Sequence, residues 1–324
     1  MLVAASEYSL LDDVSSLTPT STNKLIIASP PVLRLRTLLR TMSTTTQHLT
    51  TPAAPWTPTF ESHLSKLPSP EFVLTSLQPA PKGSPVPYLP RLRYCIYRGM
   101  WGSLPENKHN DAPRNAPTYT SDMPTFTTDV RMQKVGQFFA SSSGHASSDD
   151  QVQGSGGGGP VEAVWWVKET GTQWRMKGEA FVVGGDIDEG EGSGVRTVKS
   201  EVGRRMRRTE AEGIEGDWSW AKELTAHFGN CSPGMRGSWK NPPPGRPTNG
   251  QEPDKDHQLG QKVEDLHDPI ARENFRVVVI KPEEVEQLDI SDPATARRWK
   301  YTFVVEKGQG AEGKGEWKTE ELWP

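Results

Sequence analysis

The chain has 324 residues and a nearly balanced charge, with 37 basic and 41 acidic residues and a formal net charge of −4. This balance argues against bulk electrostatic binding to nucleic acid, and no apolar run approaches the ~20 residues of a membrane-spanning helix. Two cysteines, Cys95 and Cys231, are too few for a disulfide framework or a four-thiolate zinc site, so a reducing compartment is expected. The mean hydropathy of −0.65 indicates long polar loops, and 11 Trp supply material for a core.

Residues 1–50 are rich in Ser and Thr and include a short Arg-bearing apolar stretch, Leu33–Arg40. One interpretation is an unstructured extension, and the other is an organelle-targeting peptide. Acidic residues near the start argue against targeting, and Met42 offers a second start position. We expect a cytoplasmic protein, or a mitochondrial one if residues 1–41 are a transit peptide, with a single folded domain over residues 55–324.

The apolar positions between residues 60 and 78 predict a short amphipathic helix, then a second helix or an irregular packing segment. Alternating polar and apolar residues predict strands further along the chain. These strands are expected at residues 91–98, 125–130, 161–167, 173–183, 275–280, 299–306 and around Trp317. In the first of them Leu92, Tyr94 and Ile96 share one face. A helix is expected over residues 130–139.

Three segments lack hydrophobic periodicity and are interpreted as surface insertions near residues 140–160, 184–200 and 240–268. The first is Ser- and Gly-rich and is expected to be a flexible loop that includes Gly156–Gly159. Several short strands with few helices favour a mainly β (α+β) fold, a barrel or a sandwich.

Several familiar chemistries are not supported by the motifs present. The chain has no phosphate-binding loop of the Gly-x-x-x-x-Gly-Lys-Ser/Thr type and no Gly-x-Ser-x-Gly nucleophile elbow. His257 and His267 lie near acids in a polar segment, where a solvated loop explains them as well as a metal site. The basic run Arg204–Arg208 fits a solvated face beside an acidic loop.

A set of basic and hydroxyl residues at predicted strand positions is more informative. A phosphate monoester requires several cationic and hydroxyl donors, and an isoalloxazine ring requires an apolar wall with polar groups at one edge. Taken singly, each residue is more often an exposed strand side chain. The set consists of Arg93, Arg98, Thr127, Thr128, Arg131, Lys134, Gln173 and Arg175.

The order of several stretches resembles the FMN-binding core of the pyridoxamine 5'-phosphate oxidase family, in its divergent FMN-binding-domain branch. The core stretches are Arg91–Gly102, Thr125–Lys134 and Trp165–Gly178. The resemblance continues through Ser232–Lys240, Asn274–Val277, Pro282–Leu288 and Leu322–Pro324. It implies a split β-barrel that binds FMN, with a few flanking helices, and pairing into homodimers with FMN at the interface.

The resemblance also implies roles for single residues. Arg93 and Arg98 stand at the two ends of the strand that touches FMN. Thr127, Thr128 and Lys134 match phosphate contacts. The family's Ser and Arg are replaced by Met132 and Gln133, and Arg131 offers a substitute cation. Gln173 matches a Gln near the flavin, with Arg175 close behind it.

The substrate side departs from the family pattern. An Arg-x-His-x-Arg run in the family corresponds here to Ala296–Lys300, where Ala296 and Arg298 replace the first Arg and the His. Lys300 is kept as a possible flavin contact. This departure puts pyridoxamine phosphate, and a role in vitamin B6 metabolism, in doubt.

Three functions are considered, and the third, a barrel that has lost flavin and serves as an interaction scaffold, is the weakest because Arg93, Thr128, Lys134 and Gln173 are retained. The first is an FMN-dependent oxidoreductase in which the flavin accepts a hydride from a small substrate. The second is a flavin-binding protein without turnover, used for storage or sensing. No catalytic residue and no metal ligand is predicted.

Overall fold

The computed structural model describes residues 51–143, 154–188, 190–209, 216–250, 253–306 and 314–324, all within one compact unit, Thr46–Pro324. The expectations for residues 1–50 lie outside the described residues. No helix in the described ranges is long and apolar enough to cross a membrane.

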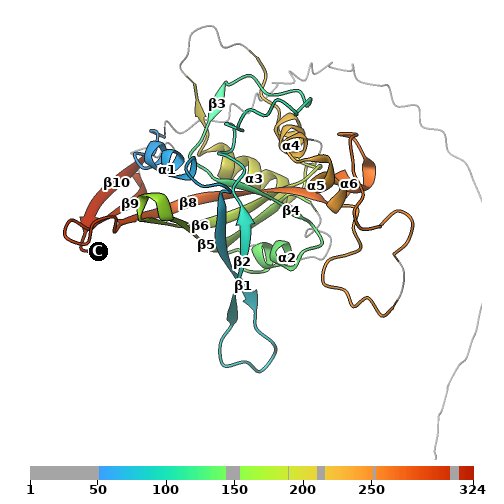
Figure 1. The fold of residues 1–324 in the computed structure, drawn as a ribbon, viewed down its shortest axis with the longest axis horizontal. Helices are drawn as coiled ribbons and strands as arrows, with labels where there is room; N and C mark the ends of the chain where they lie inside the picture. Colours follow the sequence, from blue (N-terminus) through green and yellow to red (C-terminus); the bar gives the residue numbers. More distant parts are fainter. Residues whose placement is uncertain (1–50, 144–153, 189, 210–215, 251–252, 307–313) are drawn as a thin grey trace, which may run out of the picture. The chain divides into compact units, whose positions relative to one another are not determined.

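An antiparallel sheet organises the domain, as Figure 1 shows. Its strands follow the order β10-β9-β8-β6-β5-β1-β2, and β4 pairs with β8 away from this path. The strands are β1 (Glu71–Pro79), β2 (Tyr88–Ile96), β4 (Thr125–Asp129), β5 (Gly156–Val167), β6 (Thr172–Val183), β8 (Phe275–Asp289), β9 (Arg297–Glu306) and β10 (Lys314–Leu322). Two short strands, β3 (Tyr119–Thr120) and β7 (Arg207–Arg208), form a separate pair.

The path of named strands does not close into a ring within the described residues. Its two sides nevertheless meet, because the chain just after β2 bonds to the start of β4. Arg98 N–H donates to the Thr125 carbonyl at 2.8 Å, and Thr125 N–H donates to the Gly99 carbonyl at 2.9 Å. This curled sheet with an open side, accompanied by a few helices, confirms the predicted mainly β, split-barrel class.

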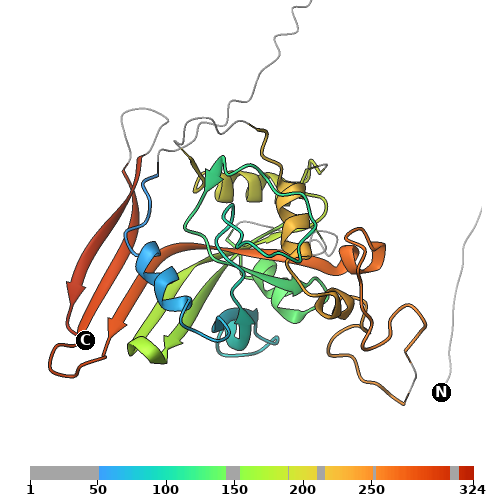
Figure 2. The same ribbon diagram turned by 45° about the horizontal axis from the view of Figure 1, so that its top comes forward.

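In the described part of the chain six helices surround the sheet, and Figure 2 shows α3 and α4 on one side of the long strand β8. They are α1 (Thr57–Leu64), α2 (Gln133–Ala140), α3 (Ser193–Gly203), α4 (Trp220–Gly229), α5 (Pro233–Ser238) and α6 (Pro269–Asn274), with a 3₁₀ turn at Lys168–Thr170. Side-chain caps begin three of them, because Ser219, Ser232 and Asp268 each accept from a first-turn N–H. Helix α2 packs on β1 and β5, and α3 packs on β5 and β6.

Two apolar clusters fill the domain. One occupies the inner face of the sheet, where Trp165 and Trp174 are fully buried and pack edge-on against Phe60 of α1. The other, around Phe228 and Phe275, lies between the sheet and α3 and α4. Alternation along the strands explains both, since every second side chain points inward.

Two expectations are wrong. The segment expected as a second helix or irregular packing is strand β1, in which Phe72, Leu74 and Ser76 alternate into the core. The glycine run Gly156–Gly159, expected in a flexible loop, begins strand β5. The run pairs with Ala180–Val182 of β6, and it needs glycine because a Cβ on Gly159 would lie 2.6 Å from the Phe138 carbonyl oxygen of α2.

The other expected strands and the helix expected at 130–139 are present with shifted ends. Helix α2 buries Val135, Phe138 and Phe139, and strand β8 runs nine residues beyond its expected end. The segment near 184–200, expected as an insertion, contains most of α3, whose Val195 and Val198 are buried. Leu92 and Tyr94 do share one face of β2, but it is the outer one, with exposed fractions of 72% and 76%.

Candidate functional site

Four predicted residues meet in one cavity of about 930 Å³. Arg98 follows β2, Thr127 and Thr128 lie on β4, and Lys134 lies in the first turn of α2. The contact between the end of β2 and β4 described above places these segments side by side. The cavity therefore has a polar end that three separate elements build.

Lys134 and Thr128 form the centre of this polar end. Lys134 Nζ donates to Thr128 Oγ1 at 3.1 Å and lies 2.7 Å from the sulfur of Met132. Burial lowers the pKa of Lys134, and the charge of Arg93 lowers it further, whereas Cys95 and Asp129 raise it. Among the residues described, Lys134 has no ion pair. A bound anion would supply the charge partner that this ammonium lacks.

Arg98 is a second cation on the cavity wall. Its Nη2 donates to the sulfur of Met235 at 2.9 Å, and its buried Nε has no hydrogen-bond partner in the described part of the chain. Arg98 also lines a neighbouring cavity of about 470 Å³ together with Glu61 and Tyr97. The guanidinium thus lines both cavities, and no carboxylate of the described residues pairs with it.

Arg93 and Arg131 lie nearby but outside the lining of the cavity. Arg93 donates to Ser76 Oγ at 2.6 Å and to Gln137 Oε1 at 2.7 Å, which ties β2 to β1 and α2. Arg131 binds both carboxylate oxygens of Asp129, at 2.9 and 2.6 Å. Arg93 and Arg131 thus stabilise the elements around the site, and Asp129 neutralises the charge of Arg131.

Gln173, Arg175 and Lys300 are not brought to this cavity. They lie on the outer face of the sheet, where Arg175 contacts Glu162 at 3.4 Å and Glu286 at 3.2 Å. Lys300 lies 3.8 Å from Glu320. Within one chain, the predicted flavin contacts therefore form two separate groups.

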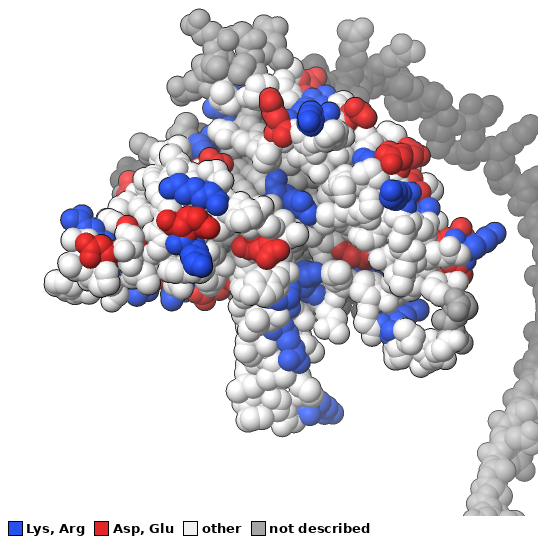
Figure 3. Space-filling view, in the orientation of Figure 1, with Lys and Arg blue, Asp and Glu red and all other residues white. Residues whose placement is uncertain are grey.

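A single register row nevertheless connects the two groups. Paired residues of neighbouring antiparallel strands project to the same face. The row runs Tyr94, Val73, Val164, Arg175, Glu286 and Lys300 across β2, β1, β5, β6, β8 and β9. Because Tyr94 also lines the cavity, the outer face begins at the cavity rim. Figure 3 shows Lys and Arg side chains gathered along the β1–β2 hairpin.

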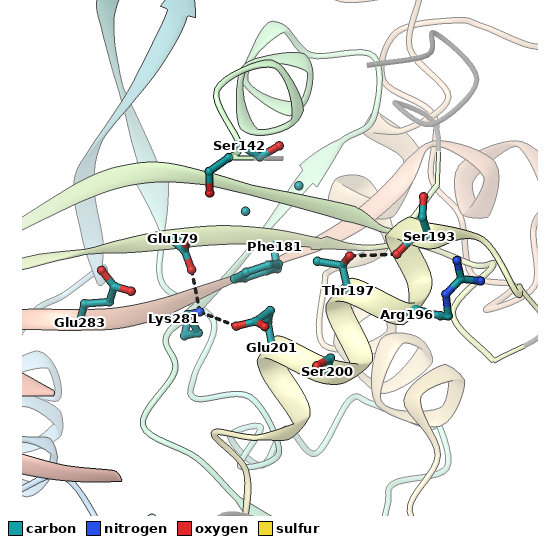
Figure 4. A pocket seen from close by; sticks show the side chains of 13 residues that line it. Ser142, Glu179, Phe181, Ser193, Arg196, Thr197, Ser200, Glu201, Lys281 and Glu283 are labelled. Atoms are coloured by element: carbon teal, nitrogen blue, oxygen red, sulfur yellow. Dashed lines mark hydrogen bonds and ion pairs between the residues drawn. The ribbon is translucent and has the colours of Figure 1, made fainter. Parts of the chain in front are cut away.

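Another cavity, of about 670 Å³, lies between α3 and the sheet and is shown in Figure 4. Its buried Lys281 contacts Glu179 at 2.6 Å and Glu201 at 2.8 Å. Arg196, at its edge, is exposed. Since its carboxylates neutralise the buried lysine, this cavity offers an anion less than the first one does.

Sequence reasoning missed half of the cavity wall. Trp239 and Asn241 line it, and so does the Pro-rich segment Pro242–Pro247, which was expected to be a surface insertion. Leu259 closes the rim and is 72% exposed. The neighbouring stretch Ser232–Lys240 was part of the family resemblance and could have indicated that this wall belongs to the site. His257, considered as a metal ligand, lies 3.0 Å from Asp254 in an exposed loop.

The residues present fit a phosphoflavin. The polar end offers Lys134, Arg98 and two threonine hydroxyls, and the buried Nε of Arg98 is an N–H donor that awaits an acceptor. The prolines, Leu259 and the Tyr94 ring supply apolar walls for a flat ring system.

Comparison with known proteins agrees with this geometry. Residues 53–184 match the family model "Pyridoxamine 5'-phosphate oxidase, FMN-binding domain". The resemblance inferred from the sequence is thus confirmed for residues 53–184, which match this FMN-binding domain family. No curated protein matches the chain.

Solved structures give a weaker likeness. One is a pyridoxamine 5'-phosphate oxidase-related, FMN binding protein from Nostoc punctiforme PCC 73102, at 16% identity and a TM-score of 0.46, over 84% of this chain and 100% of that one. Another is PhzG from Burkholderia lata 383 in complex with tetrahydrophenazine-1-carboxylic acid, at 13% identity and a TM-score of 0.35, over 84% and 94% of the two chains.

Proposed function

We propose that the protein is a flavoprotein that binds FMN in the 930 Å³ cavity and acts as an oxidoreductase on a small substrate. The observation that carries the proposal is the pairing of Lys134 with Thr128 at the polar end, where the ammonium lacks a carboxylate partner within the described chain. A phosphate monoester provides the nearly double negative charge that such an end accommodates.

When bound, the flavin would supply the redox chemistry by accepting a hydride equivalent from the substrate. The residues of this chain would hold and orient it. Lys134, Thr128 and Arg98 would bind the phosphate end, and the wall of Pro242–Pro247 would exclude water from the ring. Arg93 would support the site indirectly, by fixing α2 through Gln137.

The alternative is flavin binding without turnover, for storage or sensing. It is supported by the substrate-side run at 296–300, in which Arg298 and Lys300 lie on the outer face and are paired with carboxylates. Arg298 lies 2.5 Å from Glu286, and Ala296 offers no polar group. Pyridoxamine phosphate therefore cannot be assumed to be the substrate. It is the first compound to test as one.

A homodimer is part of the proposal. The outer face carries exposed apolar side chains at Leu92, Tyr94 and Trp166, and this face continues to Gln173 and Arg175. If two copies pair through this face, each could contribute Gln173 and Arg175 to its partner's cavity. This would bring the two groups of predicted flavin contacts together in one site.

Two further points remain predictions. They are the assignment of residues 55–324 to one domain and the location of the protein in the cytoplasm.

The first test is an absorbance spectrum of the purified protein, with identification of any cofactor released on denaturation. Bands near about 370 and 450 nm together with free FMN are expected. A matched pair of variants then tests the site. Lys134→Ala should lose FMN affinity at least about tenfold, whereas exposed Lys82→Ala should not. Equal FMN affinity in both variants would contradict the phosphate assignment, and a protein that never takes up FMN would contradict the function.

A further inference from the structure

The sulfur of Met132 lies at the polar end of the cavity, between the two groups proposed to hold the phosphate. Met132 Sδ is 2.7 Å from Lys134 Nζ and 3.6 Å from Thr128 Oγ1. All three residues line the cavity. The thioether thus occupies the place in which an anionic oxygen would meet these donors.

A thioether is a weak, neutral acceptor, whereas an ammonium bonds best to anionic oxygen. Asp129, the nearby carboxylate, is held by Arg131 through two hydrogen bonds. Met132 is therefore the substitute partner of Lys134 in the ligand-free protein. Because methionine is unbranched and flexible, its sulfur can leave when a stronger acceptor arrives.

The arrangement is repeated on the facing wall. Arg98 Nη2 donates to Met235 Sδ at 2.9 Å, so a second cation of the cavity wall also contacts a methionine sulfur. Met132 is the more accessible of the two, with 37% of its surface exposed, and small oxidants in solvent can reach it. Methionine sulfoxide is polar and is a far stronger acceptor than the thioether.

We propose that Met132 is a site of oxidative modification by peroxides that controls whether an anionic cofactor can bind at Lys134. This inference rests on the proposed function. In the step, the Met132 sulfur attacks one peroxide oxygen, the O–O bond breaks and an S–O bond forms. The sulfur is oxidised, and the peroxide is reduced to water. The new sulfoxide oxygen accepts from Lys134 and Thr128 and competes with the phosphate.

The experiment measures FMN affinity by quenching of flavin fluorescence, before and after exposure of the full chain to hydrogen peroxide. Peptide mass spectrometry reports the oxygen added at Met132. A thiol reductant after the exposure reverses sulfenate and disulfide formation at Cys95, which also lines the cavity. Methionine sulfoxide reductases then test whether affinity returns.

Two variants of similar volume complete the design. Met132→Leu removes the sulfur and keeps the bulk, and Met132→Gln places a permanent amide acceptor at the same position. We expect the oxidised wild type and Met132→Gln to bind FMN about tenfold more weakly than the reduced wild type. The FMN affinity of Met132→Leu should be the same before and after exposure to peroxide.

Three results would overturn the inference while leaving the proposed function intact. They are unchanged affinity in wild type shown to be oxidised at Met132, an equal loss of affinity in peroxide-treated Met132→Leu, and full affinity in Met132→Gln. Failure of the reduced wild type to bind FMN at all would instead overturn the proposed function, and this inference with it.

Discussion

The indole Nε1 of Trp239 donates a hydrogen bond to the main-chain carbonyl of Thr128 across 3.0 Å. The carbonyl of Trp239 in turn accepts from Asn274 at 2.9 Å and from Arg131 at 3.2 Å. One buried residue thus joins α5 and the Pro-rich wall to the strand that carries the polar end of the cavity.

Replacement of Trp239 by Phe should destabilise the domain by about 1–3 kcal/mol, because it leaves the buried Thr128 carbonyl without its donor. FMN affinity should fall as well, since the wall loses its anchor. Urea denaturation and flavin titration would measure the two effects. Trp323→Phe is the control, because Trp323 is 93% exposed, and an equally large effect there would contradict the prediction.

Lys281→Met should destabilise the domain by roughly 3 kcal/mol, because Glu179 and Glu201 lose their shared buried counterion (Figure 4). Lys318→Met, at a position 62% exposed, should change little. Burial alone would lower the pKa of Lys281, but hydrogen bonds with the two carboxylates outweigh it and raise the pKa. This stabilisation should therefore be complete below about pH 10.5 and lost as the pH rises through the higher folded pKa. Similar urea midpoints for wild type and Lys281→Met at neutral pH would refute the assignment.

Acid sensitivity should trace to His227 of α4. Burial, with a further contribution from Arg98 and Arg114, lowers the pKa of His227 to about 3. A histidine with a depressed folded pKa stabilises the protein above the unfolded pKa, near 6.5, and this stability falls between pH 6.5 and about 3. The loss should be on the order of 4 kcal/mol.

Replacement of His227 by Phe should flatten the dependence of the free energy of unfolding on pH across this interval. Its ring can keep the stacking on Trp101, which lies 5.7 Å away. Exposed His109→Gln should leave the dependence as it is. Urea midpoints at several pH values between 7 and 4 would distinguish the two variants, and an unchanged slope in His227→Phe would count against this account.

Leu92→Asp should dissociate the proposed dimer, because it places a charge in the exposed apolar stripe on β2 and because Leu92, unlike Tyr94, does not line the cavity. FMN affinity should fall along with dimerisation if Gln173 and Arg175 act across the interface. Val305→Asp, at a position 55% exposed, is the matched control. Sedimentation velocity with and without FMN would measure the change, and a wild type that stays monomeric at high concentration would remove the dimer from the proposal.

Local sequence patterns predicted the strands whose side chains alternate, such as β6 with its buried Trp174 and Met176 and its half-buried Gln173 and Arg175. They failed at β1, because apolar residues at 64, 67, 72, 74 and 77 fit a helix as well as a strand. They also failed at Gly156–Gly159, where composition suggested a loop but pairing with β6 forms a strand. Tertiary contacts decide such segments, and no local pattern reports them.

The site was predictable only in part. The cations Arg98 and Lys134 and the hydroxyl of Thr128 could be identified because residue type and order carry the chemistry of phosphate binding. The sequence did not reveal that Asp129 neutralises Arg131, or that Arg175 and Lys300 lie on the outer face. The Asp129–Arg131 pair is local, but the positions of Arg175 and Lys300 depend on their register with Glu286, which for Arg175 joins residues more than a hundred positions apart.

Helix α2 carries Lys134 near its first turn, and the glycines that begin β5 pack against its last one. Any side chain at Gly159 would meet Ser141 and Phe138 and push the helix away from the sheet. The glycine run thus sets the distance between α2, which carries Lys134, and the sheet. Among natural or engineered variants, tolerance to change at Gly159 should follow the ability to retain an anionic cofactor.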